Sequence, residues 1–287
     1  MKHCHLHRQV IGLVLILGLL LSCLGCSSAA TSDVVPLTVT LLKVGKADAI
    51  VVLCGSHAMV LDTGEEDDGE EVIEFLQNHG VQELDAMIIT HFDQDHVGGA
   101  DTILEAIPVR TIYVPDYDGS HTEYHDFLEA AEAAHIPIQR LQASISFSIE
   151  DAQVLIEPPN SYEIPENSSD FDNNFSLITT IVHGDNRFVF MGDAEKQRIR
   201  QWLSEDTAVP CDFLKVPHHG IYNGALEELF TALQPAVSVI CSSKKNPAER
   251  ETLELLKSSC PHVLETKDGN VVVISNGTSL EVHQERK

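Results

Sequence analysis

Residues 90–99 read Thr-His-Phe-Asp-Gln-Asp-His-Val-Gly-Gly, and the rest of the chain is best understood by working outward from them. Two apolar residues, Ile88 and Ile89, lead into this stretch and are typical of a buried strand. Four side chains that bind metals follow within six residues: His91, Asp93, Asp95 and His96. Imidazole and carboxylate ligands together suit zinc or manganese. The pattern therefore predicts a metal-binding loop after a strand.

The spacing of these four residues predicts more than one ion. Alternate side chains of an extended segment face opposite sides. His91, Asp93 and Asp95 are thus expected on one side and His96 on the other, so that one loop serves two neighbouring ions. Gly98 and Gly99 are expected to let the chain turn sharply out of the loop. The alternative interpretation is a solvated polar turn, because Asp is common in turns.

Several stretches of the chain resemble one known superfamily. His91–His96 resembles the HxHxDH signature of the metallo-β-lactamase superfamily, with Asp93 in place of the second His. Residues 61–64 (Leu-Asp-Thr-Gly) resemble its early Asp motif, and residues 190–195 resemble its later motif with a metal-bridging Asp. Residues 214–220 and 173–177 are similar to a narrower branch, the C-terminal domain of ComEC-type competence proteins and phosphorylcholine esterases of bacterial surfaces. The similarity runs from about Pro36 to the C-terminus.

This resemblance implies a fold and a metal content. The fold is a four-layer αββα sandwich of the α/β class, and the interleaved strand and helix patterns after residue 36 fit it. The cofactors are two divalent metal ions, zinc in the first place and manganese as the alternative. The resemblance assigns His91 and Asp93 to one ion, and Asp95, His96 and His219 to the other. Asp193 would bridge the two ions.

The same resemblance assigns catalytic roles. The protein would be a hydrolase whose nucleophile is a metal-bound hydroxide, with Asp95 in the catalytic group. His218 would face the substrate and donate to a phosphoryl oxygen or a leaving group. Lys215 would stabilise charge, or else be an ordinary lysine at a strand edge. Asn174 stands near the place of the family's third His and would complete the first ion site together with water. Asp62 would orient a ligand through a hydrogen bond rather than bind the ion itself.

One departure from the branch pattern concerns the leaving group. ComEC-like domains usually carry a further His before a Pro after the final core strand, whereas this chain has Asn246 before Pro247. Asn can donate a hydrogen bond, but it cannot protonate an oxygen near neutral pH as an imidazole can. The sequence therefore predicts an enzyme that works best on activated leaving groups.

The N-terminus predicts export. Lys2 and Arg8 precede the apolar run Val10–Leu21, which is typical of a secretory signal and short for a membrane span. Residues 1–26 are interpreted as a lipoprotein-type signal peptide, residues 27–35 as a tether and residues 36–287 as the hydrolase domain. Cys23 and Cys26 are both candidates for lipidation. The alternative is an ordinary cleaved signal or a retained anchor, so that the protein is either a membrane-anchored lipoprotein outside the cytoplasm or a secreted protein.

The charge of the chain bears on its substrate. The formal net charge is −26, and loss of Lys2 and Arg8 with the acid-free residues 1–22 takes it to −28. Such a charge repels polyanions, and no basic stripe of the kind that binds duplex nucleic acid is present. The leading hypothesis is an exported hydrolase of phosphodiester or phosphoester bonds in a small molecule or on a cell surface. Three alternatives stay open: a carboxylic ester, lactone or β-lactam hydrolase, a ComEC-type nuclease, and a non-catalytic binding lipoprotein.

The cysteines outside the signal region do not form a disulfide pattern. Their spacing is not that of a disulfide scaffold, and buried free thiols are expected. These residues are Cys54, Cys211, Cys241 and Cys260.

Overall fold

The computed structural model describes residues 34–163 and 171–285. Val35–Lys287 forms one compact unit. The predicted signal peptide and both lipidation candidates, Cys23 and Cys26, lie outside the described residues. Within the described ranges, no helix is both long enough and apolar enough to span a membrane.

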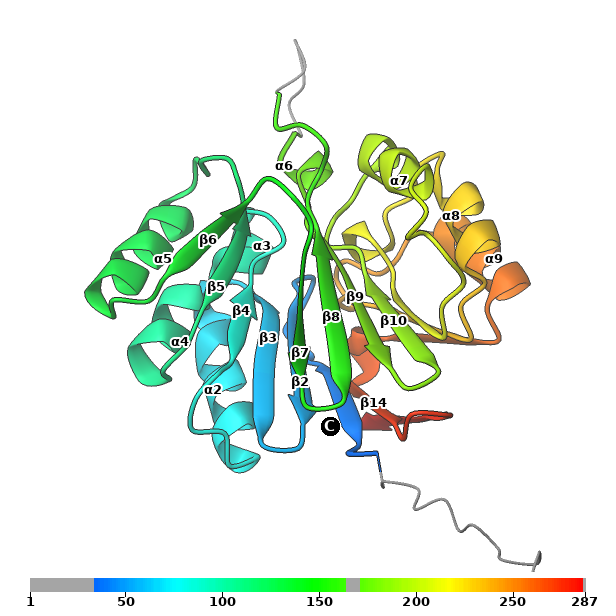
Figure 1. Cartoon of the computed structure of the whole chain (residues 1–287). Coiled ribbons are helices and arrows are strands. Elements are labelled where there is room, and N and C mark those ends of the chain that lie inside the picture. The colour runs from blue at the N-terminus through cyan, green and yellow to red at the C-terminus, as the bar shows by residue number, and fades with distance from the viewer. Residues whose placement is uncertain (1–33, 164–170, 286–287) are drawn as a thin grey trace, which may run out of the picture. The chain divides into compact units, whose positions relative to one another are not determined.

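Two mixed β-sheets form the centre of the unit (Figure 1). The first has eight strands in the order β15 (Leu280–Glu285), β14 (Asn270–Ser275), β1 (Leu37–Leu41), β2 (Ala49–Cys54), β3 (His57–Thr63), β4 (Ala86–Ile88), β5 (Ile112–Pro115) and β6 (Ile138–Leu141). The second has seven strands in the order β13 (His262–Glu265), β12 (Val237–Ile240), β11 (Phe213–Lys215), β10 (Asn186–Phe190), β9 (Ile178–His183), β8 (Ala152–Glu157) and β7 (Ile145–Ile149).

Helices flank the sheets on both outer sides (Figure 1). The first sheet is covered by α2 (Gly69–Asn78), α4 (Ala100–Ala106) and α5 (Thr122–Ala133), and the second by α7 (Lys196–Leu203), α8 (Leu226–Leu233) and α9 (Arg250–Ser259). Short helical turns lie in the connecting loops: η1 (Glu66–Asp68), α3 (Gln94–Val97), α6 (Phe171–Asn174), η2 (His218–Gly220) and η3 (Thr266–Asp268).

Three apolar layers hold these elements together. The middle layer joins the two sheets, for example through Val39 of β1 and Phe213 of β11, both fully buried. A second layer packs α2, α4 and α5 on the first sheet, and a third packs α7, α8 and α9 on the second. The predicted four-layer αββα sandwich is therefore confirmed.

The strand directions bring the predicted motifs to one edge of each sheet. β3 and β4 run parallel, and β10, β11 and β12 also run parallel to one another. Because the carboxyl ends of parallel strands meet at the same edge, the loops that follow these strands lie side by side. The motifs at residues 61–64, 90–99, 190–195 and 214–220 lie at these strand ends and in the loops that follow them.

The role expected for the two glycines after the metal loop was wrong. Gly98 and Gly99 have φ angles of −56° and −82°, which any residue adopts, so no sharp turn depends on them. They are needed instead for close packing. A Cβ atom on Gly98 would lie 2.5 Å from the backbone nitrogen of Glu66, and one on Gly99 would lie 2.5 Å from the carbonyl oxygen of Thr63.

Candidate metal centre

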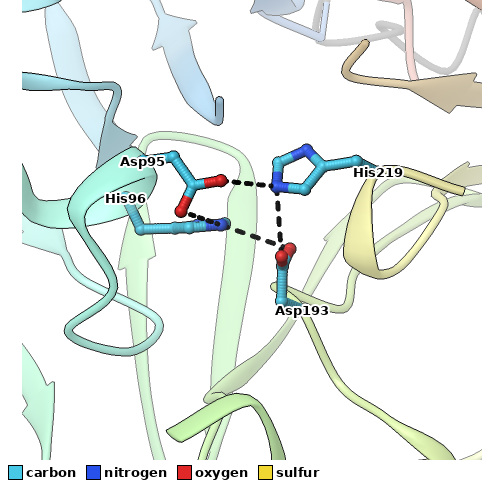
Figure 2. Close-up of side chains that lie close together, drawn as sticks. All are labelled: Asp95, His96, Asp193 and His219. Carbon is cyan, nitrogen blue, oxygen red and sulfur yellow. Dashed lines mark ion pairs between the residues drawn. The ribbon is translucent and has the colours of Figure 1, made fainter. Parts of the chain in front are cut away.

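Four side chains from three loops converge on one point (Figure 2). Asp95 and His96 come from α3, Asp193 from the loop after β10, and His219 from η2. One ligand atom from each of them lies within 4.8 Å of all the others. His219 Nε2 is 3.2 Å from Asp95 Oδ2 and 3.1 Å from Asp193 Oδ2, while His96 Nε2 is 3.2 Å from Asp193 Oδ1. This spacing fits one divalent ion among the four residues.

The orientation of His96 is set by Asp62. His96 Nδ1 lies 2.8 Å from Asp62 Oδ2. Because a carboxylate can only accept, Nδ1 carries a proton, and Nε2 points into the cluster as the atom that would bind an ion. Asp62 itself is held by Thr90, whose backbone N–H and hydroxyl group donate to the two carboxylate oxygens over 2.7 and 2.8 Å.

The other two histidines are oriented in the same way. His219 Nδ1 lies 3.1 Å from the carbonyl oxygen of Cys241, to which it donates. His91 Nδ1 lies 3.0 Å from Thr90 Oγ1, whose own proton is already given to Asp62. The Nε2 atoms of His91, His96 and His219 are all buried, and they face carboxylate oxygens at 3.1–3.5 Å. Imidazole nitrogens and carboxylates that face one another in a buried cluster are the donor set of a zinc-type metal site.

Charge pairing keeps the metal-free cluster together. Burial raises the pKa of Asp193, but the neighbouring His219, His96 and Lys215 outweigh burial and hold this pKa well below its usual range. Burial lowers the pKa of His219, but Asp193 and Asp95 outweigh it and raise this pKa to about 9. The cluster therefore carries protons at neutral pH that a metal ion would displace.

His91 and Asp93 form a second pair beside the cluster. His91 Nε2 lies 3.5 Å from Asp93 Oδ2. The imidazole rings of His91 and His96 are in contact, with their centroids 4.1 Å apart. The two halves of the predicted dinuclear site are thus neighbours.

The backbone at the end of β11 is strained. His218 and His219 have φ angles of 47° and 50°, a left-handed conformation that non-glycine residues seldom adopt. The structure stabilises it through the His218 N–H, which donates to the carbonyl oxygen of Gly192 over 3.2 Å, and through the bond from His219 to Cys241. Such strain directs the two rings to different places: His219 into the cluster, and His218 to its edge, 3.9 Å from Asp193 Oδ2.

Comparison with known proteins identifies the family. Residues 42–244 match the profile of the metallo-beta-lactamase superfamily. The chain belongs to this superfamily. Two curated relatives are ComE operon protein 3 of Bacillus subtilis, 31% identical over 71% of this chain, and Recombination protein 2 of Haemophilus influenzae, 28% identical over 72% of it. The aligned regions cover 26% and 24% of those proteins, so the chain spans about a quarter of their length. The resemblance to the ComEC branch is confirmed.

Other matches are shorter or more distant. A hydroxyacylglutathione hydrolase of Aeromonas hydrophila is 32% identical over 29% of this chain and 35% of its own length. The metallo-beta-lactamase fold protein YhfI from Bacillus subtilis superposes with a TM-score of 0.55 at 12% identity, covering 84% of this chain and all of YhfI. A metallo hydrolase from Ignicoccus hospitalis gives 0.51 at 15% identity, covering 87% of this chain and all of its own. These two structures show the superfamily fold alone.

Lys215 does not extend from a strand edge to solvent, but lies next to Asp193 of the cluster. Its side chain is fully buried at the end of β11. Nζ pairs with the Asp48 carboxylate and donates to the carbonyl oxygen of Gly192 over 2.9 Å. Burial lowers the pKa of Lys215, but Asp48 and Asp193 outweigh burial and raise this pKa above its usual value. The ammonium group is therefore charged and faces protein oxygens.

Asp48 is a site residue that the sequence interpretation missed. Its side chain is 1% exposed. Its carboxylate oxygens lie 3.6 Å from His219 Nδ1 and 3.8 Å from His96 Nδ1. A signal was present in the sequence, because a single Asp between apolar residues ahead of a strand is unusual for a solvated turn.

The two asparagines of the 173–177 motif have different roles. Asn174 Oδ1 accepts the backbone N–H of Arg198 over 3.1 Å and so holds the first turn of α7. Asn173 is 7% exposed, lines the cavity beside the cluster, and its Oδ1 has no hydrogen-bond partner among the described residues. Asn173 therefore has the free ligand atom that was expected of Asn174.

A cavity of about 750 Å³ opens beside the metal loop. Its walls are rich in carboxylates and include Lys46, Asn246 and one aromatic side chain, Phe171. The carboxylate residues are Glu65, Glu66, Asp67, Asp93, Asp95, Glu123 and Asp172. The cavity is large enough for a small-molecule substrate and electrostatically unfavourable for a polyanion.

Proposed function

We propose that this protein is an exported, metal-dependent hydrolase that cleaves phosphodiester or phosphoester bonds in small substrates. The observation that carries the proposal is the convergence of the His96 and His219 Nε2 atoms with Asp95 and Asp193, with His91 beside them, next to a cavity of about 750 Å³. The superfamily membership supports hydrolysis, and the donor set supports a divalent metal, with zinc first and manganese second.

The residues divide between two proposed ions. Asp95, His96, Asp193 and His219 would hold one ion, and His91 and Asp93 the other, with Asn173 in the place expected for Asn174. Divalent ions, when bound, lower the pKa of water to about 7 and offset the negative charge of a phosphoryl group. Asp193 contacts both histidines of the cluster, and the superfamily resemblance assigns it the shared position between the two ions.

The protein side chains would orient the substrate and handle the proton. His218 lies at the edge of the cluster, with a side chain 14% exposed. Burial lowers the pKa of His218, so the ring is neutral at pH 7 and donates one N–H. We assign it the bond to a phosphoryl or leaving oxygen. Asn246, on the cavity wall, supplies a second donor that cannot release a proton.

The cavity favours small substrates over nucleic acid. Seven carboxylate residues line it, against one lysine. A ComEC-type nuclease is nevertheless the second candidate, because ComE operon protein 3 is 31% identical over most of this chain. Hydrolysis of a carboxylic ester or thioester is a third, supported by the shorter match to hydroxyacylglutathione hydrolase.

One panel of substrates separates these functions. The purified protein is assayed on bis(4-nitrophenyl) phosphate, a nitrophenyl carboxylic ester, a lactone and a β-lactam, and on double-stranded and single-stranded linear DNA. Each assay is run with and without a chelator. We expect chelator-sensitive cleavage of the phosphodiester, lost in Asp193→Asn. Preferential cleavage of DNA would favour the nuclease, and cleavage of the carboxylic ester alone would refute the proposal. Bound metal with no turnover on any substrate would favour a binding protein.

A further inference from the structure

We infer that Lys215 and Asp48 form a buried, charge-neutral pair that positions the ligands of the metal centre. The inference rests on the metal centre proposed above, but not on the bond that the enzyme cleaves. Its basis is that one ion pair, inaccessible to solvent, contacts every loop that carries a ligand of the four-residue cluster.

The ammonium group of Lys215 is enclosed by oxygens. Its neighbours are the Asp48 carboxylate, the carbonyl oxygen of Gly192 at 2.9 Å and Asp193 Oδ1 at 3.5 Å. Lys215 is 0% and Asp48 1% exposed. Nζ therefore holds both the backbone before Asp193 and the Asp193 carboxylate itself, whose Oδ1 it shares with His96 Nε2.

Asp48 extends the same connection to the other loops. Its backbone N–H donates to the carbonyl oxygen of Asp95 over 3.0 Å, and its carbonyl oxygen accepts the N–H of Gly64 over 2.8 Å, next to the Asp62 motif. Its Oδ1 lies 3.6 Å from His219 Nδ1. Asp48 precedes β2 of the first sheet, whereas Lys215 ends β11 of the second. The pair thus joins the two sheets directly beneath the cluster.

A positioning role and simple charge repulsion predict opposite effects of Lys215 on metal affinity. A lysine near a divalent ion repels it, so removing only the charge of Lys215 should tighten metal binding. If the pair instead holds Asp193 and the Asp95 loop in place, its removal should weaken metal binding even when net charge is conserved. Outer partners of metal ligands typically contribute about 10–100-fold to affinity.

The test uses three variants of the whole protein. Lys215→Met removes the charge, and Lys215→Met combined with Asp48→Asn removes both charges and conserves the net charge. Lys46→Met is the matched control, because Lys46 Nζ lies 3.8 Å from Asp95 Oδ2 but is partly exposed. Zinc affinity is measured by competition with a chromophoric chelator, and the Tm of the metal-free protein by calorimetry.

We expect zinc affinity to fall about 10–100-fold in the double variant, as for other outer partners of metal ligands. Lys215→Met should also bind more weakly and should have the lowest metal-free Tm, because it leaves the Asp48 carboxylate buried and unpaired. Lys46→Met should change affinity only a few fold, as exposed ion pairs do. The double variant stays informative where Lys215→Met does not fold.

Two results would overturn the inference: wild-type zinc affinity in the double variant, or tighter binding by Lys215→Met. Zinc binding by the wild-type protein without phosphodiesterase activity would refute the proposed function instead, and would leave the comparison of variants fully interpretable.

Discussion

Asp62 Oδ2 accepts the Nδ1 proton of His96 over 2.8 Å, and this one bond fixes which nitrogen of His96 faces the candidate metal centre. The same oxygen accepts the Thr90 hydroxyl, which in turn lies 3.0 Å from His91 Nδ1. A single buried carboxylate therefore orients histidines of both halves of the site. It does so from β3, in a position where Asp62 itself has a φ of 54°.

The first prediction is that Asp62→Ala lowers zinc affinity. Loss of the acceptor frees the tautomer and the ring orientation of His96, and partners of this kind are typically worth about 10–100-fold in metal affinity. The measurement is chelator competition. Asp85→Ala is a matched control, because Asp85 Oδ2 also accepts from a histidine, His57 Nδ1 at 3.0 Å, away from the cluster. Equal zinc affinities in the two variants would contradict the assigned role.

The second prediction separates the two adjacent asparagines. Asn173→Ala should lower the occupancy of the ion at His91 and Asp93, because it removes an unpartnered oxygen that lines the cavity. Asn174→Ala should leave the stoichiometry unchanged and lower Tm, because it removes the bond to Arg198 N, a loss of about 0.5–2 kcal/mol for a capping residue. Metal analysis and calorimetry on both variants are the measurements. If Asn174→Ala lowered the metal occupancy and Asn173→Ala lowered only the Tm, Asn174 would be the metal ligand instead.

The third prediction concerns pH and the metal-free protein. Asp193 and Asp95 outweigh the effect of burial and raise the pKa of His219 to about 9, above its ordinary value of 6.5. Protonated His219 therefore contributes stability that is fully present below pH 6.5 and is lost as pH rises through about 9. The Tm of the metal-free wild-type protein should fall as pH rises from 6.5 through about 9, and the Tm of His219→Gln should fall less over the same pH range. A flat Tm profile in the wild-type protein would contradict the proton-bearing cluster.

The fourth prediction concerns the leaving group. With Asn246 in place of a histidine, a nitrophenyl phosphodiester should be cleaved much faster than an alkyl one. A general acid typically contributes about 10²–10⁴-fold, so Asn246→His should narrow the rate difference between the two diesters. His218→Ala removes a hydrogen-bond donor to the leaving oxygen and should slow the alkyl diester most. Steady-state rates on both diesters provide the test. Equal rates on the two substrates, with both unaffected by His218→Ala, would show that the proton donor lies elsewhere.

The fifth prediction concerns location. If Cys23 or Cys26 carries a lipid, its replacement by Ser should move the protein from the membrane fraction to the soluble fraction. Stable anchoring needs more than one acyl chain, and the diacylglyceryl group of a lipoprotein meets this requirement. The measurement is fractionation of cells that express each single variant. Unchanged fractionation in both would favour simple secretion.

The sequence by itself determined the fold class and the central metal motif. The motif is a short-range pattern of ligand types crowded into residues 91–96, and the fold class followed from the superfamily resemblance, which the interleaved strand and helix patterns fit. The buried strand expected before the metal loop is observed as Ala86–Ile88. The four cysteines expected as buried thiols are free and buried.

Only the tertiary structure decided that Asp48 and Lys215 support the proposed metal ligands, whereas Asp62 was expected from the sequence. Asp48 and Lys215 lie in different sheets, and nothing in either segment indicates that their charges meet in a buried pair. Asn173 and Asn174 are identical in type and adjacent, yet one faces the cavity and the other the start of α7. Gly98 and Gly99 are explained only by the approach of η1 and β3. Local pattern sets the secondary structure and the chemistry of a motif, but the partner of a buried polar group is chosen by packing across the whole fold.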